Sequence, residues 1–187
     1  MREIVIGGAQ MGPIQKVECR EAVIDRMLAL MAEAQNAGCG LVVFPELCLT
    51  TFFPRWYFEE QSDVDFWFEK SMPNDVTMPL FIKSRELGIA ISFGYAEITP
   101  EGSHFNTSIL TDNNGNIIGK YRKVHLPGHS EYDNQRAFEH SSILKNGTSN
   151  LEILASQFGT IWMPLWACAF ATTVAGRRYI VKWVYKE

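Results

Sequence analysis

The chain has 187 residues, of which 47% are hydrophobic and 20% charged, and its formal net charge is −4. This length allows one domain, or one domain and a fraction of another. The composition is typical of a globular protein, and the negative charge gives no reason to expect nucleic acid or an anionic membrane surface as a partner.

The N-terminus and the cysteines both favour a cytoplasmic protein. Met1 leads directly into a strand-like segment, without the basic and apolar stretches of a secretion signal. The four cysteines, at positions 19, 39, 48 and 168, show no C-x-x-C spacing, so we expect reduced thiols. The glycosylation sequons at Asn106 and Asn146 mean little without secretion.

The first elements form a strand–helix–strand unit. Residues 4–10 are apolar and β-branched enough for a strand, and residues 18–37 carry an apolar stripe at helical spacing that stops at Gly38. Residues 41–44 form a short apolar run that suits a strand buried on both faces. A unit of this length predicts parallel strands joined by a right-handed crossover.

The next elements are predicted from similar patterns. We expect a helix over 63–69 with Phe66 and Trp67 buried, and a second over 76–87 that ends at Gly88. A third strand covers 89–97. Two further strands, 105–111 and 116–121, form a hairpin around the Asp-Asn-Asn-Gly turn at 112–115.

The stretch 41–56, LVVFPELCLTTFFPRW, places a carboxylate directly after the buried strand. The simpler interpretation is that Glu46 points to solvent where the strand ends. Pro45 instead ends the strand abruptly, and the apolar residues that follow would enclose the carboxylate. An enclosed carboxylate holds a proton more readily, as a general base must.

The stretch 120–129, KYRKVHLPGH, lies about 75 residues further on. FPEL followed by KYRKxHL resembles the nitrilase superfamily of carbon–nitrogen hydrolases. The strings LTTFFPRW, GYAE, FNTSIL and HLPGH are similar, more narrowly, to N-carbamoyl-D-amino acid amidohydrolases. The resemblance extends from about residue 4 to about residue 140.

This resemblance implies an α/β fold: the N-terminal part of a four-layer α-β-β-α sandwich, with the C-terminal half missing. It also implies a Glu–Lys–Cys site that hydrolyses amide-like C–N bonds through a covalent acyl-enzyme. Glu46 would be the general base, Lys123 would stabilise the oxyanion, and His125 would form hydrogen bonds near the site. A fixed cation suits that role, since negative charge develops on oxygen in the transition state. No metal or organic cofactor is implied.

Other candidate residues have competing interpretations. Phe53, Arg55 and Trp56 could line the substrate pocket, or the aromatic rings could fill the core. Cys48 is interpreted as a packed small residue, because the family does not place its nucleophile there. Lys120 and Arg122 are expected to be solvated. A metal site at His125 and His129 is disfavoured, because no third ligand is evident.

The chain changes character near residue 140. Residues 1–140 hold 12 Lys and Arg against 19 Asp and Glu, a net charge of −7, whereas residues 141–187 hold 5 against 2, a net charge of +3. The tail also carries three of the five tryptophans. We therefore divide the chain into 1–140, the N-terminal part of a carbon–nitrogen hydrolase domain, and 141–187, a tail outside its pattern.

The family's nucleophile should follow Lys123 by about 45 residues, in a strand resembling GMCICNDRRWPE. The chain instead has WACAFATTVAGRRYIVKW, and Cys168 lacks that context. Read one base out of register with permitted synonymous bases, codons 144–157 can encode EKRYFEPGNLGFP and codons 165–180 can encode VGMCICNDRRWPEVY. A frameshift near 141–144 is therefore our hypothesis. The nucleophilic cysteine codon would then straddle Phe170 and Ala171.

The sequence thus predicts an amidohydrolase of N-carbamoyl-D-amino acids whose present chain lacks its nucleophile and is inactive. A β-ureidopropionase or carbamoyl-putrescine amidase relative is the alternative enzyme. A non-catalytic fragment that at most binds an intact paralogue is the alternative from another class. The expected partner is a small N-carbamoyl amino acid, and a homo-oligomer is expected for the intact form only.

Overall fold

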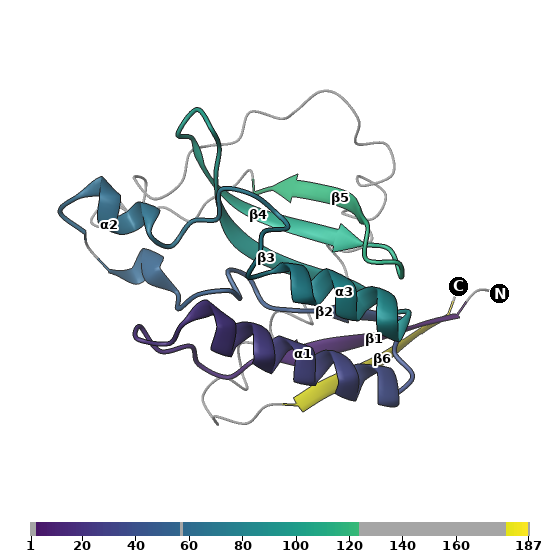
Figure 1. Cartoon of the computed structure of the whole chain (residues 1–187). Helices are drawn as coiled ribbons and strands as arrows, with labels where there is room; N and C mark the ends of the chain where they lie inside the picture. Colours follow the sequence, from purple (N-terminus) through teal and green to yellow (C-terminus); the bar gives the residue numbers. More distant parts are fainter. Residues whose placement is uncertain (1–2, 57, 124–178, 187) are drawn as a thin grey trace.

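The computed structural model describes residues 3–56, 58–123 and 179–186. At its centre is one six-stranded sheet in the order β5-β4-β3-β2-β1-β6 (Figure 1). The strands are β1 (Glu3–Gln10), β2 (Leu41–Val43), β3 (Ala90–Ile98), β4 (His104–Thr111), β5 (Ile117–Arg122) and β6 (Tyr179–Lys186).

The predicted strand–helix–strand unit is confirmed. β1 and β2 are parallel, with Ile6 opposite Leu41, and α1 (Arg20–Asn36) connects them. β3 then adds to β2 in parallel, with Val43 opposite Ser92. The carboxyl ends of these three strands therefore lie at one edge of the sheet, which is where the residues after β2 leave it.

One face of the sheet is covered by α1 and by α3 (Met78–Leu87), as Figure 1 shows. α3 ends as predicted at Gly88, which is left-handed with φ 65°. The largest apolar cluster joins the two helices to alternate positions of the strands, and burial of this surface is the main term that holds the helices in place. Its members include Met27, Met31, Leu80, Val42, Ile91, Phe93 and Ile109.

The predicted hairpin is also confirmed, as antiparallel β4 and β5. Oδ1 of Asp112 accepts backbone N–H bonds from Asn114 and Asn116, each at 2.8 Å, and so closes the turn. Gly115 has φ 78°, and a Cβ there would lie 2.2 Å from the carbonyl oxygen of Phe81 in α3. The turn therefore packs directly against the helix at a position where only glycine fits.

The helix predicted over 63–69 differs from the structure. α2 covers only Gln61–Asp65, and Phe66 is 65% exposed, whereas Trp67 is buried as expected. Trp67 stacks on Phe53 with ring centroids 5.9 Å apart, and Phe66 contacts the outer side of Trp67 edge-on. The prediction that both neighbours are buried was wrong, because the helix ends at Asp65 and only one of the two adjacent side chains after it packs inward.

Part of the tail belongs to the sheet. β6 pairs antiparallel with β1 along its whole length, from Glu3 opposite Lys186 to Gln10 opposite Tyr179. Residues 179–186 thus satisfy the backbone hydrogen-bonding groups on the outer side of β1. Within the described part of the chain, no helix is long and apolar enough to cross a membrane.

Candidate active site

The turn that carries Glu46 leaves β2 and lies over the neighbouring strand. The N–H of Phe44 donates to the carbonyl of Ser92 at 2.8 Å, and the N–H of Cys48 donates to the carbonyl of Gly94 at 3.0 Å. Leu47, between them, adopts a left-handed conformation with φ 50° that is unusual for a residue with a side chain. The chain therefore reverses directly after Glu46 and is held to β3 on both sides of it.

Gly94 makes this close approach possible. A Cβ at Gly94 would lie 3.1 Å from the backbone nitrogen of Leu47 and 3.2 Å from Cα of Glu46. Contacts this short are tighter than side-chain atoms normally tolerate. The missing side chain of Gly94 thus sets the height of Glu46 above the sheet.

Glu46 and Lys123, the two predicted catalytic residues, lie together. Nζ of Lys123 is 2.7 Å from Oε1 of Glu46, although the residues are 77 positions apart in sequence. The side chain of Lys123 is 33% exposed and that of Glu46 is 19% exposed, so the pair is partly shielded from water. A carboxylate that can accept a proton and a fixed cation beside it can serve acyl transfer at an amide carbon as general base and oxyanion stabiliser.

Asn106 is a third member of the site that the sequence reasoning missed. Its Nδ2 donates to Oε1 of Glu46 at 2.5 Å, and its backbone carbonyl accepts the N–H of Lys123 at 2.8 Å. Asn106 is only 8% exposed, and its amide is occupied, so it is not presented as a glycosylation acceptor. The string FNTSIL contained a signal for this residue. Alternation along β4 directs the adjacent polar side chains of Asn106 and Thr107 to opposite faces of the sheet, so each face receives one of them.

A second charged cluster lies on the helix-covered face of the sheet. Glu97 accepts hydrogen bonds from Lys120 at 2.5 Å, from Arg122 at 2.9 and 3.0 Å, and from Thr107 at 2.7 Å. Burial by itself would raise the pKa of Glu97, but the bonds from Arg122, Lys120 and Thr107 outweigh it and lower the pKa to about 2. The expectation that Lys120 and Arg122 are simply solvated is wrong, because both bind this carboxylate.

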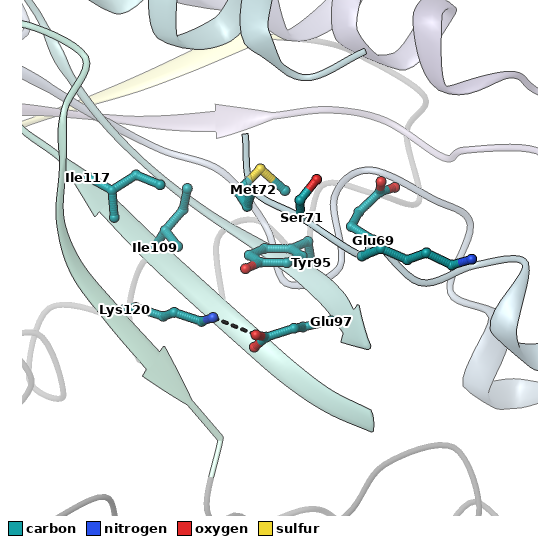
Figure 2. A pocket seen from close by; sticks show the side chains of 9 residues that line it. Glu69, Ser71, Met72, Tyr95, Glu97, Ile109, Ile117 and Lys120 are labelled. Atoms are coloured by element: carbon teal, nitrogen blue, oxygen red, sulfur yellow. Dashed lines mark hydrogen bonds and ion pairs between the residues drawn. The ribbon is translucent and has the colours of Figure 1, made fainter. Parts of the chain in front are cut away.

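A cavity of about 110 Å³ lies beside this cluster and is lined by Tyr95, Glu97 and Lys120 together with residues 69–72. Figure 2 shows the Lys120–Glu97 contact at its wall. Glu69, also in the lining, is already bound by Arg20 at 2.5 Å and by Asn74 at 2.7 Å. Both carboxylates in the cavity wall, Glu69 and Glu97, are thus bound by side chains of the protein itself.

The remaining candidate residues lie in different surroundings. Phe53 is fully buried and packs on Trp67 and Phe68, so its contacts are those of a core residue. Arg55 is exposed, with its guanidinium carbon 4.8 Å from the ring centroid of Trp56. His125 and His129 lie outside the described residues. Among the described residues, no group of three His, Cys, Asp or Glu side chains could hold a metal ion.

Cys48 is a packed residue, as the sequence suggested. It is 2% exposed and belongs to the cluster beneath α1 and α3, and burial raises the pKa of its thiol to about 12. A thiol that holds its proton this strongly is a poor nucleophile. Cys168, Phe170 and Ala171 lie outside the described residues.

Comparison with known proteins finds relatives along most of the chain. The N-carbamoylputrescine amidase of Arabidopsis thaliana is 26% identical over 163 residues, which cover 86% of this chain and 49% of the relative. A nitrilase of Pyrococcus abyssi is 34% identical over 97 residues, 52% of this chain and 35% of the relative. The chain therefore spans about half the length of curated relatives that it matches.

Solved structures show the same fold. An amidase from Nesterenkonia sp. AN1 superposes with a TM-score of 0.58 at 22% identity, covering 76% of this chain and 50% of the amidase. A carbon–nitrogen hydrolase from Helicobacter pylori G27 gives a TM-score of 0.60 at 19% identity, covering 75% and 46%. The family described as carbon-nitrogen hydrolase matches residues 6–184, and the chain therefore belongs to the carbon-nitrogen hydrolase family.

Proposed function

We propose that this chain represents an amidohydrolase that cleaves the carbamoyl C–N bond of N-carbamoyl-D-amino acids. The overall reaction converts the substrate and water into the D-amino acid, ammonia and carbon dioxide. The observation that carries the proposal is the 2.7 Å contact between Glu46 and Lys123, which joins the two halves of the sequence pattern. The subfamily strings around both residues supply the substrate class.

In the proposed mechanism, Glu46 transfers protons, a cysteine is the nucleophile and Lys123 stabilises the oxyanion. Glu46 accepts the proton of a cysteine thiol, and the thiolate forms a bond to the carbamoyl carbon. Lys123 stabilises the negative oxygen of the tetrahedral intermediate. The C–N bond then breaks, and the leaving amine takes the proton from Glu46 and departs as the D-amino acid. Water gives a proton to Glu46 and attacks the carbamoyl carbon, and the C–S bond breaks as sulfur takes that proton back from Glu46. The carbamic acid released decomposes to ammonia and carbon dioxide. A solved variant of the Nesterenkonia amidase carries acrylamide on its active-site cysteine, which supports a cysteine nucleophile in this family.

The nucleophile is the group that this chain lacks in the expected context. We propose that a frameshift near 141–144 displaced its codon, so that it straddles Phe170 and Ala171. The changed charge and the two family-like strings in the shifted frame support this. The family match through residue 184 and the pairing of β6 with β1 argue for an in-frame tail instead.

Resequencing the gene across this segment decides whether the shift is an error in the sequence or is present in the gene. Bases that restore EKRYFEPG and CICNDRRWPE in frame would reveal a complete hydrolase, and bases that confirm the present tail would show that the gene itself encodes it. In the second case we expect the 187-residue chain to release no more ammonia than its Glu46→Ala variant. Turnover by a monodisperse sample above that control would contradict the proposed loss of the nucleophile.

A second candidate substrate class is favoured by the relatives. N-carbamoylputrescine amidases of Arabidopsis thaliana and Oryza sativa match 86% and 82% of the chain, respectively. A carbamoyl-putrescine amidase or β-ureidopropionase activity is therefore the alternative. A frame-restored protein assayed against N-carbamoyl-D-amino acids, N-carbamoylputrescine and N-carbamoyl-β-alanine separates the three, with Lys123→Met as the inactive control. If none is hydrolysed, co-purification with an intact homologue tests the non-catalytic alternative, and the intact form is expected to be a homo-oligomer.

A further inference from the structure

We propose that Asn106 is a positioning residue that holds both Glu46 and Lys123 and selects Oε2 of Glu46 as the oxygen that accepts the proton. The inference rests on the proposed function for its chemical meaning, but its geometry stands independently. Asn106 lies on β4, between β5, which Lys123 directly follows, and β3, over which the Glu46 turn passes.

The side chain of Asn106 fixes the carboxylate. An ionised carboxylate only accepts hydrogen bonds, so the amide atom that lies 2.5 Å from Oε1 must be the donor Nδ2. Because Asn106 is 8% exposed, water competes little for this bond. The amide therefore holds Glu46 in one orientation above the sheet.

The backbone of Asn106 fixes the lysine. Its carbonyl accepts the N–H of Lys123 at 2.8 Å, which extends the β4–β5 pairing one residue beyond Arg122. Strand alternation then directs Lys123 to the face opposite Lys120 and Arg122. On the helix-covered face, Glu97 binds both Lys120 and Arg122 and so holds the end of β5 in place.

The two donors converge on a single oxygen. Nδ2 of Asn106 and Nζ of Lys123 both bind Oε1 of Glu46, and among the described residues no donor binds Oε2. Oε1 is thus held by two donors, whereas Oε2 keeps its lone pairs available to accept a proton. Without the amide, the carboxylate could rotate and offer either oxygen to Lys123.

The test observes the Lys123 ammonium directly, by ¹⁵N–¹H NMR of the 187-residue chain at low temperature and mildly acidic pH. Lysine ammonium groups in ion pairs exchange slowly enough to be detected, and Lys123→Met assigns the signal. Lys120, bound to Glu97 on the opposite face, serves as an internal reference. The variants are Asn106→Leu, which is similar in size, Asn106→Ser, whose hydroxyl is too short to reach Glu46, and the same-face control Ser108→Ala.

We expect the Lys123 signal to move toward that of solvent-exposed lysines, with hydrogen exchange about tenfold faster, in both Asn106 variants. The Lys120 signal should stay in place, and Ser108→Ala should change neither. An unchanged Lys123 signal in a folded Asn106 variant would overturn the proposal. Equal shifts of Lys120 and Lys123 would also overturn it, because they would indicate general damage to β4.

Folding is checked from the backbone amide spectrum, and Asn106→Ser carries the same outcomes if Asn106→Leu does not fold. The carboxyl ¹³C signal of Glu46, assigned with Glu46→Gln, supplies a second measurement and should shift when the amide donor is lost. Neither measurement depends on turnover. Failure of the proposed hydrolase activity is therefore distinguishable from failure of this inference.

Discussion

The backbone of Glu46 lies directly against Gly94 of β3: a Cβ on Gly94 would lie 3.2 Å from Cα of Glu46. The N–H of Cys48 donates to the carbonyl of Gly94, so the turn cannot rise from β3 without losing a backbone hydrogen bond. The position of the proposed base thus depends on a glycine that carries no functional group.

Gly94→Ala should therefore displace Glu46 and destabilise the fold. Overpacking at this contact is expected to cost about 1 to 3 kcal/mol in the free energy of unfolding. Urea denaturation measures the loss, and the Lys123 ammonium signal reports the displacement. Gly40→Ala is the matched control, because a Cβ there would meet only one atom, at 4.0 Å. Equal stability of the two variants would contradict the proposed contact.

Glu97 should make stability depend on acidity. Its pKa is about 2 in the folded chain and 4.5 in the ordinary unfolded state. Since the folded value is the lower one, the unfolded chain binds more protons between these values, and stability falls as pH drops from about 4.5 toward about 2. The free energy of unfolding falls by at most about 3 kcal/mol, and by less than this because solvent screens the half-exposed Lys120.

The pH dependence is measured from urea midpoints of the wild type and of Glu97→Gln. The variant should be less stable at neutral pH and show a flatter profile through the acidic window. Glu86→Gln, at an exposed carboxylate on α3, should keep the wild-type profile. A Glu97→Gln profile parallel to the wild type would show that Glu97 does not contribute this dependence.

Cys48 should resist alkylation in the folded chain. Raising its thiol pKa from 9.0 to about 12 lowers the thiolate fraction about a thousandfold, and burial also blocks access. Exposed Cys19 should react with iodoacetamide first, as peptide mass spectrometry after timed quenching would show. Labelling in urea is the control, in which both cysteines should react. Early modification of Cys48 without urea would contradict its burial.

Gly115→Ala should destabilise the β4–β5 hairpin. The substituted Cβ would meet the Phe81 carbonyl in a backbone conformation with φ 78°. Gly102→Ala separates the two effects, because Gly102 also has positive φ, 88°, but open space around it. We expect about 1 kcal/mol for Gly102→Ala and at least twice that for Gly115→Ala, measured by thermal unfolding. Similar values would show that conformation, not contact with α3, decides the cost.

Much of the architecture could be predicted because its signals are local. The apolar stripe of α1 and the turn residues Asp112 and Gly115 were read directly from the chain, and the structure confirms each. The prediction for Phe66 was wrong because two adjacent aromatic residues give no periodic signal to identify the buried one. The pairing of β6 with β1 joins opposite ends of the chain, for which no local pattern exists.

The sequence by itself determined the family and singled out Glu46 and Lys123 as the candidate base and oxyanion-stabilising residue, since both lie in short contiguous motifs. Only the tertiary structure decided that Asn106 joins them and that Lys120 and Arg122 bind Glu97 on the other face. The physical reason is that strand alternation assigns the face of each residue, while sheet order decides which strands are neighbours. Gly94 shows the same limit: its role is the absence of a side chain, which becomes visible only when the Glu46 turn lies against it.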